Sequence, residues 1–171
     1  RKMPICSQPA PVFFVNRSLL PYMFKAIEAV AAGEDADQID ESLVDFGMPM
    51  GPIELCDQVG LDVCLDVGMV LGIAPATEAV LREKCEAQNL GRKTGAGFYQ
   101  WDGNKPDRPR AAVDAARMAD IAAAMLAPMI EQCQQAVDEG VVDSADSADA
   151  GMIFGTGFPG FRGGPLHWSQ Q

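Results

Sequence analysis

The stretch LLPYMFKAIEAVAAG (residues 19–33) occurs a second time, in altered form, as LAPMIEQCQQAVDEG (residues 126–140). The two stretches align without gaps, and each has a proline at its third position and a glycine at its last. Any two amphipathic helices share their apolar spacing, but an interior proline is rare in helices because it removes a backbone hydrogen bond. A proline at the same position in both stretches therefore favours duplication of a helical unit.

A second shared element supports the duplication. Residues 50–53 (MGPI) match residues 163–166 (GGPL) after a six-residue insertion. We therefore expect four parts along the chain. They are an extended arm from a missing N-terminal domain (1–15), a first helical copy (16–101), a polar linker (102–108) and a second, incomplete helical copy (109–171).

Local signals divide the copies into helices. Prolines and the β-rich residues 12–15 predict the extended arm. Asn16 is then an N-cap candidate, Pro21 predicts a kink or break, and Gly33 a stop. Capping and proline signals predict the other helices, which are a helix opened by Asp35, Pro52 to Val59, a helix capped by Asp62 to about Leu71, Pro75 to about Gln88, a helix from about Pro109 to Gly140, and Ser144 to Phe154. The chain is thus expected to be all-α.

Composition excludes several classes of protein. The chain has 171 residues, of which 48% are hydrophobic, and a formal net charge of −11. An acidic surface repels phosphate backbones, which argues against a nucleic-acid partner. No apolar run approaches the ~18–20 residues of a membrane span. Five cysteines without a C-x-x-C pair and a single histidine exclude a Cys/His zinc site and indicate a reducing, cytoplasmic compartment.

Three further features are interpreted as structural. Residues 155–160 (GTGFPG) match G-x-G-x-x-G, but no strand precedes them, so we expect a loop and no cofactor-binding residues in this chain. His167 lacks a plausible catalytic partner and is expected at the surface. Arg92 and Lys93 could meet a phosphate, but a solvated loop is favoured on so acidic a chain.

A set of motifs resembles a known family. The chain is similar over nearly its whole length to the C-terminal domain of 3-hydroxyacyl-CoA dehydrogenases, in the duplicated form found in fatty-acid-oxidation multifunctional enzymes. The resemblance is carried by residues 13–17 (FFVNR), 47–52 (GMPMGP), 54–57 (ELCD), 59–62 (VGLD), 90–99 (LGRKTGAGFY) and 161–166 (FRGGPL).

This resemblance implies a fold and a function. The helical domain packs on an NAD-binding Rossmann domain, which supplies a catalytic His–Glu pair for oxidation of an L-3-hydroxyacyl-CoA. The two-copy form reproduces within one chain the contact through which single-copy enzymes dimerise. Asn16 matches the asparagine that holds the substrate and the histidine, and Met48, Pro49 and Met50 are expected to line the acyl side. A thiolase subunit is a further possible partner.

Two hypotheses remain open at this stage. In the first, the chain is the C-terminal fragment of such a dehydrogenase, inactive and free of NAD when alone. In the second, it is a non-catalytic helical interaction module of the same fold. For Asn16 itself, a simple N-cap is the alternative to a role toward substrate. The reading frame upstream of Arg1 separates the two hypotheses, because only the first requires a Rossmann glycine motif there.

Overall fold

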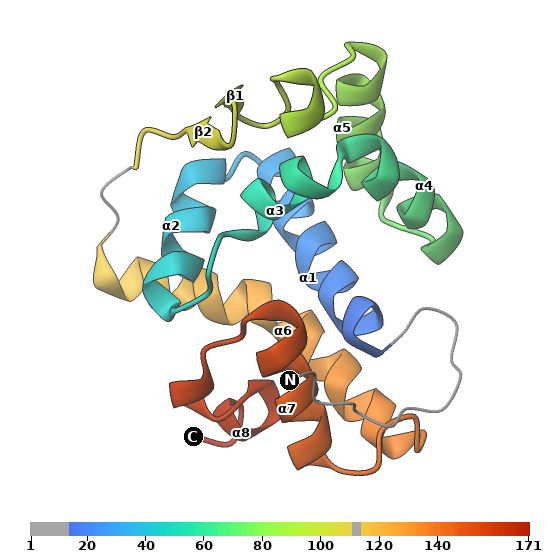
Figure 1. Cartoon of the computed structure of the whole chain (residues 1–171), viewed down its shortest axis with the longest axis vertical. Helices are drawn as coiled ribbons and strands as arrows, with labels where there is room; N and C mark the ends of the chain where they lie inside the picture. The colour runs from blue at the N-terminus through green and yellow to red at the C-terminus, as the bar shows by residue number, and fades with distance from the viewer. Residues whose placement is uncertain (1–13, 111–113) are drawn as a thin grey trace.

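The computed structural model describes residues 14–110 and 114–171, so residues 1–13 of the expected arm (1–15) lie outside the described residues. The described chain is helical apart from one small hairpin (Figure 1). Its elements are α1 (Phe14–Ala31), α2 (Ala36–Phe46), α3 (Pro52–Val59), α4 (Leu61–Leu71), α5 (Pro75–Glu86), η1 (Arg92–Thr94), β1 (Gln100–Asp102), β2 (Lys105–Asp107), α6 (Ala115–Asp138), α7 (Ala145–Thr156), η2 (Gly160–Arg162) and α8 (Pro165–Trp168). The all-α prediction is confirmed.

Helices α1 and α6, which contain the two repeated stretches, pack against each other at the centre. Their apolar stripes form the core, and the side chains that they bury almost completely are Tyr22, Met23 and Ile27 of α1 and Leu126, Met129 and Cys133 of α6. The helices run in opposite directions. Arg17 near the start of α1 pairs with Glu139 just after α6 at 2.6 Å, and Arg117 near the start of α6 pairs with Glu34 just after α1 at 2.8 Å.

The second helix of each copy contacts the first helix of the other copy. Helix α2 packs mainly on α6, the first helix of the other copy, whereas α7 packs on both α6 and α1. These reciprocal contacts between the copies, built here within one chain, resemble the contact pattern of an isologous interface. Residues 19–31 thus pack against residues 126–137, and each helix covers apolar surface of the other copy.

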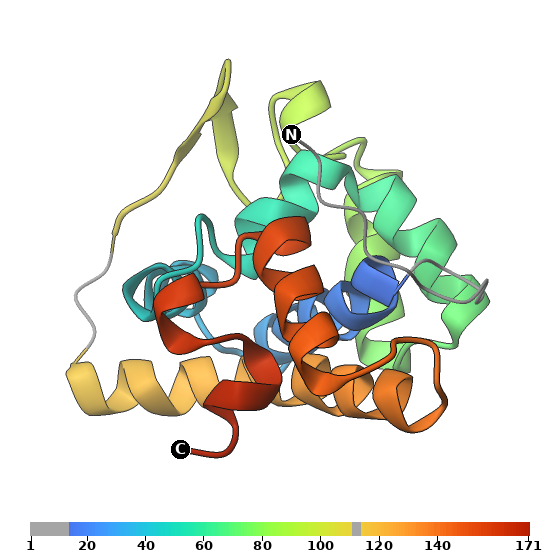
Figure 2. The same ribbon diagram turned by 60° about the horizontal axis from the view of Figure 1, so that its bottom comes forward.

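The remaining elements of the first copy cover the other side of α1. Helices α3 and α5 pack on α1, and α4 packs on α5. Strands β1 and β2 pair antiparallel, with Trp101 opposite Pro106, and the hairpin stands away from the helices in Figure 2. Among the described residues, no helix combines the length and the apolarity required to cross a bilayer.

Two expectations about α1, the extended conformation before Asn16 and the cap at Asn16, are wrong. The helix begins at Phe14, so Phe14 and Val15 are helical rather than extended, and Asn16 lies within the first turn instead of capping it. The helix also continues through Pro21 without a break. Pro21 leaves one carbonyl without its helical partner, but burial of the α1 stripe against α6 outweighs that loss.

Two further boundaries differ from the sequence prediction. Helix α4 starts at Leu61 directly after Gly60, so Asp62 lies in its first turn and is not its cap. The predicted linker over residues 102–108 contains β2 and ends in Arg108, whose side chain is only 8% exposed. In contrast, Asp35 caps α2 through the N–H groups of Asp37 and Gln38, and Pro52 opens α3, as predicted.

Candidate functional site

Asn16 lies in the first turn of α1 and is exposed to solvent. Its neighbour Val15 contacts the end of α7 so closely that a Cβ on Gly155 would lie 2.8 Å from Val15 Cγ1. Gly155 therefore permits the close approach of α1 and α7. The packing fixes the start of α1 while the amide of Asn16 stays open to a partner.

The turn that contains Met48, Pro49 and Met50 meets the same end of α7. Pro49 is exposed and lies against Gly157, where a Cβ would be 2.9 Å from Pro49 Cγ. Met48 is only 5% exposed and belongs to the core, whereas Met50 is half-buried. Asn16 and this turn, separated by about thirty residues in the sequence, thus both flank the last turn of α7.

Pro49 and Met50 also line a cavity of about 460 Å³ between α2, α3 and the β-hairpin. Its other walls are mostly charged, and they come from Glu41, Val44, Glu54, Lys105, Pro106, Arg108 and Arg110. The cavity combines two apolar side chains with several cations and anions. Such a wall suits a ligand with an apolar part and a polar part.

Arg108 is the most buried cation of this wall. Its guanidinium donates to Asp37 at 2.9 Å, to Glu41 at 2.7 Å and to Glu54 at 3.2 Å. Three carboxylates around one planar guanidinium offset the desolvation of all four groups. No local signal in the sequence marks Arg108, because it lies in a polar stretch that resembles a linker.

Asp40 connects α2 to the start of α3. Its carboxylate accepts the backbone N–H groups of Ile53 at 2.8 Å and Glu54 at 2.9 Å and the Tyr99 hydroxyl at 2.9 Å. A Cβ on Gly51 would lie 2.1 Å from Asp40 Oδ1, so only glycine fits there. Asp40 therefore caps a helix from another helix and fixes the end of the 48–51 turn.

The same arrangement occurs in the second copy. Asp149 of α7 accepts the N–H groups of Leu166 at 2.7 Å and His167 at 3.0 Å, at the start of α8. A Cβ on Gly164 would lie 2.3 Å from Asp149 Cβ. The matching aspartate, glycine and proline positions strengthen the duplication.

Asp57 holds the glycine-rich loop that follows α5. It accepts the N–H groups of Phe98 at 2.9 Å and Tyr99 at 3.0 Å and the indole N–H of Trp101 at 2.9 Å. Gly91 and Gly97 both approach Asp57 within distances that a Cβ would not allow. The motif over residues 90–99 is thus a scaffold around a buried carboxylate, which positions Tyr99 against Asp40.

Burial raises the pKa of Asp40 to about 7, and its hydrogen bonds and Arg108 only partly oppose this effect. An unfolded aspartate titrates near ~3.9, so the folded chain binds more protons between about pH 4 and pH 7. The stabilisation linked to that proton is present below the unfolded pKa and is lost as the pH rises through the folded pKa.

We predict that the free energy of unfolding of wild type falls between about pH 5 and pH 8 by about 1–3 kcal/mol more than that of Asp40→Asn, which does not titrate. Urea unfolding of both proteins at the two pH values checks this. Parallel pH profiles for the two proteins would contradict the assignment.

The other features singled out in the sequence are structural. The expected loop over residues 155–160 is only partly irregular, because residues 155–156 end α7 and Gly160 begins η2. His167 is exposed, as expected. Lys93 pairs with Asp62 at 2.5 Å and Arg92 donates to Asn104 at 3.4 Å, and both cations lie at an exposed loop.

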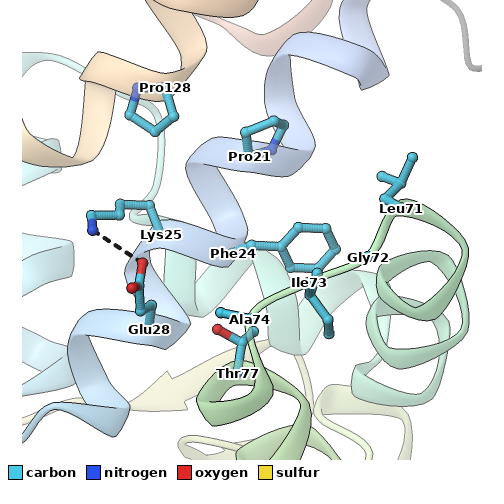
Figure 3. Close-up of a pocket in the computed structure, with 10 residues that line it drawn as sticks. All are labelled: Pro21, Phe24, Lys25, Glu28, Leu71, Gly72, Ile73, Ala74, Thr77 and Pro128. Atoms are coloured by element: carbon cyan, nitrogen blue, oxygen red, sulfur yellow. Dashed lines mark hydrogen bonds and ion pairs between the residues drawn. The ribbon is translucent and has the colours of Figure 1, made fainter.

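A second cavity, of about 300 Å³, contains both repeated prolines (Figure 3). Pro21 and Pro128 line it together with Phe24 and the 71–74 loop after α4, and the Lys25–Glu28 ion pair of 3.0 Å supplies its charged groups. Among the described residues that line this cavity, the one cation and the one anion, Lys25 and Glu28, are thus paired with each other. The polar groups do not converge on a reacting atom, so this cavity is not a candidate active site.

Comparison with known proteins identifies the family. The model of the 3-hydroxyacyl-CoA dehydrogenase C-terminal domain matches residues 13–101, more than half of the chain, and the match includes Asn16 and the 48–50 turn. The chain belongs to this family.

Relatives of the 3-hydroxyacyl-CoA dehydrogenase C-terminal domain cover the second copy as well. The fatty acid oxidation complex subunit alpha of Vibrio cholerae is 36% identical over 180 residues, covering 98% of this chain and 25% of the relative. The protein of the same name from a Shewanella strain is 36% identical over 191 residues, covering 98% of this chain and 26% of the relative. The chain thus spans about a quarter of the length of these curated relatives.

Solved structures show the same fold. The 3-hydroxybutyryl-CoA dehydrogenase of Escherichia coli superposes with a TM-score of 0.75 at 22% identity, covering 99% of this chain and 55% of that one. The dehydrogenase part of multifunctional enzyme 1 from C. elegans gives a TM-score of 0.65 at 26% identity, covering 85% of this chain and 37% of that one. The duplicated helical arrangement is therefore shared with dehydrogenases.

Proposed function

We propose that this chain is the C-terminal part of an NAD-dependent L-3-hydroxyacyl-CoA dehydrogenase of fatty-acid β-oxidation in the cytoplasm. The family match over residues 13–101 carries the proposal. The names of the relatives, fatty acid oxidation complex subunit alpha, support the pathway.

The geometry supports a division of labour between this chain and a Rossmann domain. The described residues contain no strand–glycine loop–helix unit that would bind the pyrophosphate of NAD, and their one histidine, His167, is a surface residue of the second copy. The residues present therefore do not fit the cofactor. We assign NAD and the proton-abstracting base to the domain that precedes this one in the complete enzyme.

The proposed role of this chain is to bind and orient the acyl-CoA substrate. Asn16 offers an exposed amide on a firmly packed helix, and an amide N–H there can donate to a substrate oxygen. Pro49 and Met50, which line the cavity of about 460 Å³, supply apolar surface for the acyl chain. The second copy replaces the partner subunit of a dimer, since α6 and α7 cover α1 and α2 from the same chain.

We predict that this chain alone has no dehydrogenase activity. Titration of NADH or acetoacetyl-CoA into it is expected to give little or no heat, because no described unit binds a dinucleotide and a net charge of −11 opposes CoA phosphates. Addition of the Rossmann domain, in the same chain or separately, is expected to restore NADH formation from 3-hydroxybutyryl-CoA. Oxidation of this substrate well above background by the chain alone would contradict the assignment.

The full-length enzyme tests the proposal itself. It is expected to reduce NAD⁺ with 3-hydroxyacyl-CoA substrates. If it folds, contains both domains and oxidises none of them, the chain is instead a non-catalytic interaction module.

A further inference from the structure

A side chain from the second copy binds the end of α2, directly before the 48–50 turn. Arg162 Nε donates to the carbonyl oxygen of Phe46 at 2.8 Å, and the guanidinium carbon lies 4.1 Å from the centroid of the Phe46 ring. The last carbonyls of a helix lack intrahelical partners. A cation at this end stabilises the helix, because it lies next to the negative end of the helix dipole. Helix α2 has no basic residue in its own last turn, so Arg162 supplies the missing cation.

Aromatic packing fixes the same point. Phe158 and Trp168 place their rings edge-on to Phe46, with centroids 5.7 Å and 4.9 Å away. Phe161 lies against Gly47, where a Cβ would be 2.9 Å from its ring. The second copy therefore contacts Phe46 and Gly47 on several sides, and these two residues lead directly into Met48.

The contact has a counterpart in the opposite direction. Residues 47–52 (GMPMGP) align with residues 160–165 (GFRGGP), which makes Pro49 and Arg162 equivalent positions. Pro49 contacts Gly157 at the end of α7, and Arg162 contacts Phe46 at the end of α2. Each turn thus covers the end of the second helix of the other copy.

The equivalent positions differ in chemistry. The first copy presents Met48, Pro49 and Met50, and the second presents Phe161, Arg162 and Gly163. A proline contributes only apolar packing, whereas an arginine contributes a hydrogen bond, a charge and ring stacking. The contact of Arg162 with the end of α2 is therefore more specific than the contact of Pro49 with the end of α7.

We propose that Arg162 is a positioning residue for the dehydrogenase reaction, which fixes the 48–50 turn and through it the acyl side of the substrate cleft. This inference rests on the function proposed above. The second copy then acts on the first copy's site without touching the substrate. Loss of Arg162 frees the Phe46 carbonyl and lets the turn move, while Asn16 on α1 keeps its place.

The test compares Arg162→Gln with wild type in the full-length enzyme, using acyl chains of increasing length. We expect the KM for long-chain 3-hydroxyacyl-CoA to rise about tenfold, with kcat nearly unchanged and short chains little affected, because the turn contributes binding rather than chemistry. Arg162→Lys keeps the cation but loses the planar stacking, so it is expected to recover only part of the loss. Arg117→Gln is the matched control, since Arg117 also joins the two copies but does so through exposed Glu34.

Hydrogen exchange gives a readout that is independent of activity. The N–H groups of Gly47 and Met48 both donate to the Leu43 carbonyl, at 3.2 Å and 2.9 Å. We expect both amides to exchange about tenfold faster in Arg162→Gln, and the Gly33 amide at the end of α1 to stay unchanged.

Unchanged KM values at every chain length, or an equal change in Arg117→Gln, overturns the proposal. If wild type itself oxidises no substrate, the proposed function fails, and the exchange rates of Gly47 and Met48 still decide whether Arg162 fixes the turn.

Discussion

If the proposed function holds, replacement of Asn16 by alanine is expected to lower the kcat of the full-length enzyme by about 10²–10³, the effect of removing one preorganised donor from an active site. The stability is expected to change little. Asn16 lies within the first turn of α1, two residues after its start, so the substitution removes no helix cap, and alanine is the better helix former. Steady-state kinetics and thermal unfolding of the same preparation measure both effects.

Asn104→Ala provides a matched control, because Asn104 is an exposed asparagine in the turn between β1 and β2. It is expected to leave kcat unchanged. Full activity in Asn16→Ala would remove Asn16 from the site, and a lowered melting temperature with unchanged kcat would return it to a purely structural role.

Replacement of Asp40 by alanine is expected to cost about 3–5 kcal/mol of folding free energy. The substitution leaves the N–H groups of Ile53 and Glu54 and the Tyr99 hydroxyl without their acceptor, and each unsatisfied buried group costs about 1–3 kcal/mol. A loss of this size is a large part of the stability of a typical domain. Urea unfolding of the chain at about pH 6 measures it.

Two variants calibrate that measurement. Asp45→Ala removes an exposed carboxylate from the same helix and is expected to change stability by less than about 0.5 kcal/mol. Asp149→Ala removes two hydrogen bonds rather than three, at the four-residue helix α8, and is expected to cost less than Asp40→Ala. Equal stability of Asp40→Ala and Asp45→Ala would show that Asp40 does not act as a cap.

Local signals in the sequence located most helices because they act over a few residues. The Asp35 side chain caps α2 through N–H groups two and three positions on, and Pro52 occupies the first position of α3. The cap predicted at Asn16 was wrong, since α1 starts two residues earlier, at Phe14. Val15, in that first turn, packs against Gly155 of α7. Tertiary contact there overrides a local cap preference.

The repeat was visible in the sequence, but only the structure explains why some apolar positions of the first copy are polar in the second. Phe24 and Ile27 of α1 align with Glu131 and Gln134 of α6. In the described residues, α5 covers α1, and no element that corresponds to α5 covers α6. The α6 positions are exposed and polar for that reason.

The sequence by itself therefore determined the helical class, the duplication, the family and Asn16 as a candidate, all of which follow from short motifs and from periodic spacing. Only the tertiary structure decided which charged and polar groups meet. Arg108 and Asp37 are 71 residues apart, Tyr99 and Asp40 are 59 apart, and Arg162 and Phe46 are 116 apart. Such pairs have no fixed spacing along the chain, because their geometry depends on how whole helices pack, and packing is driven by non-directional burial of apolar surface that no local motif encodes.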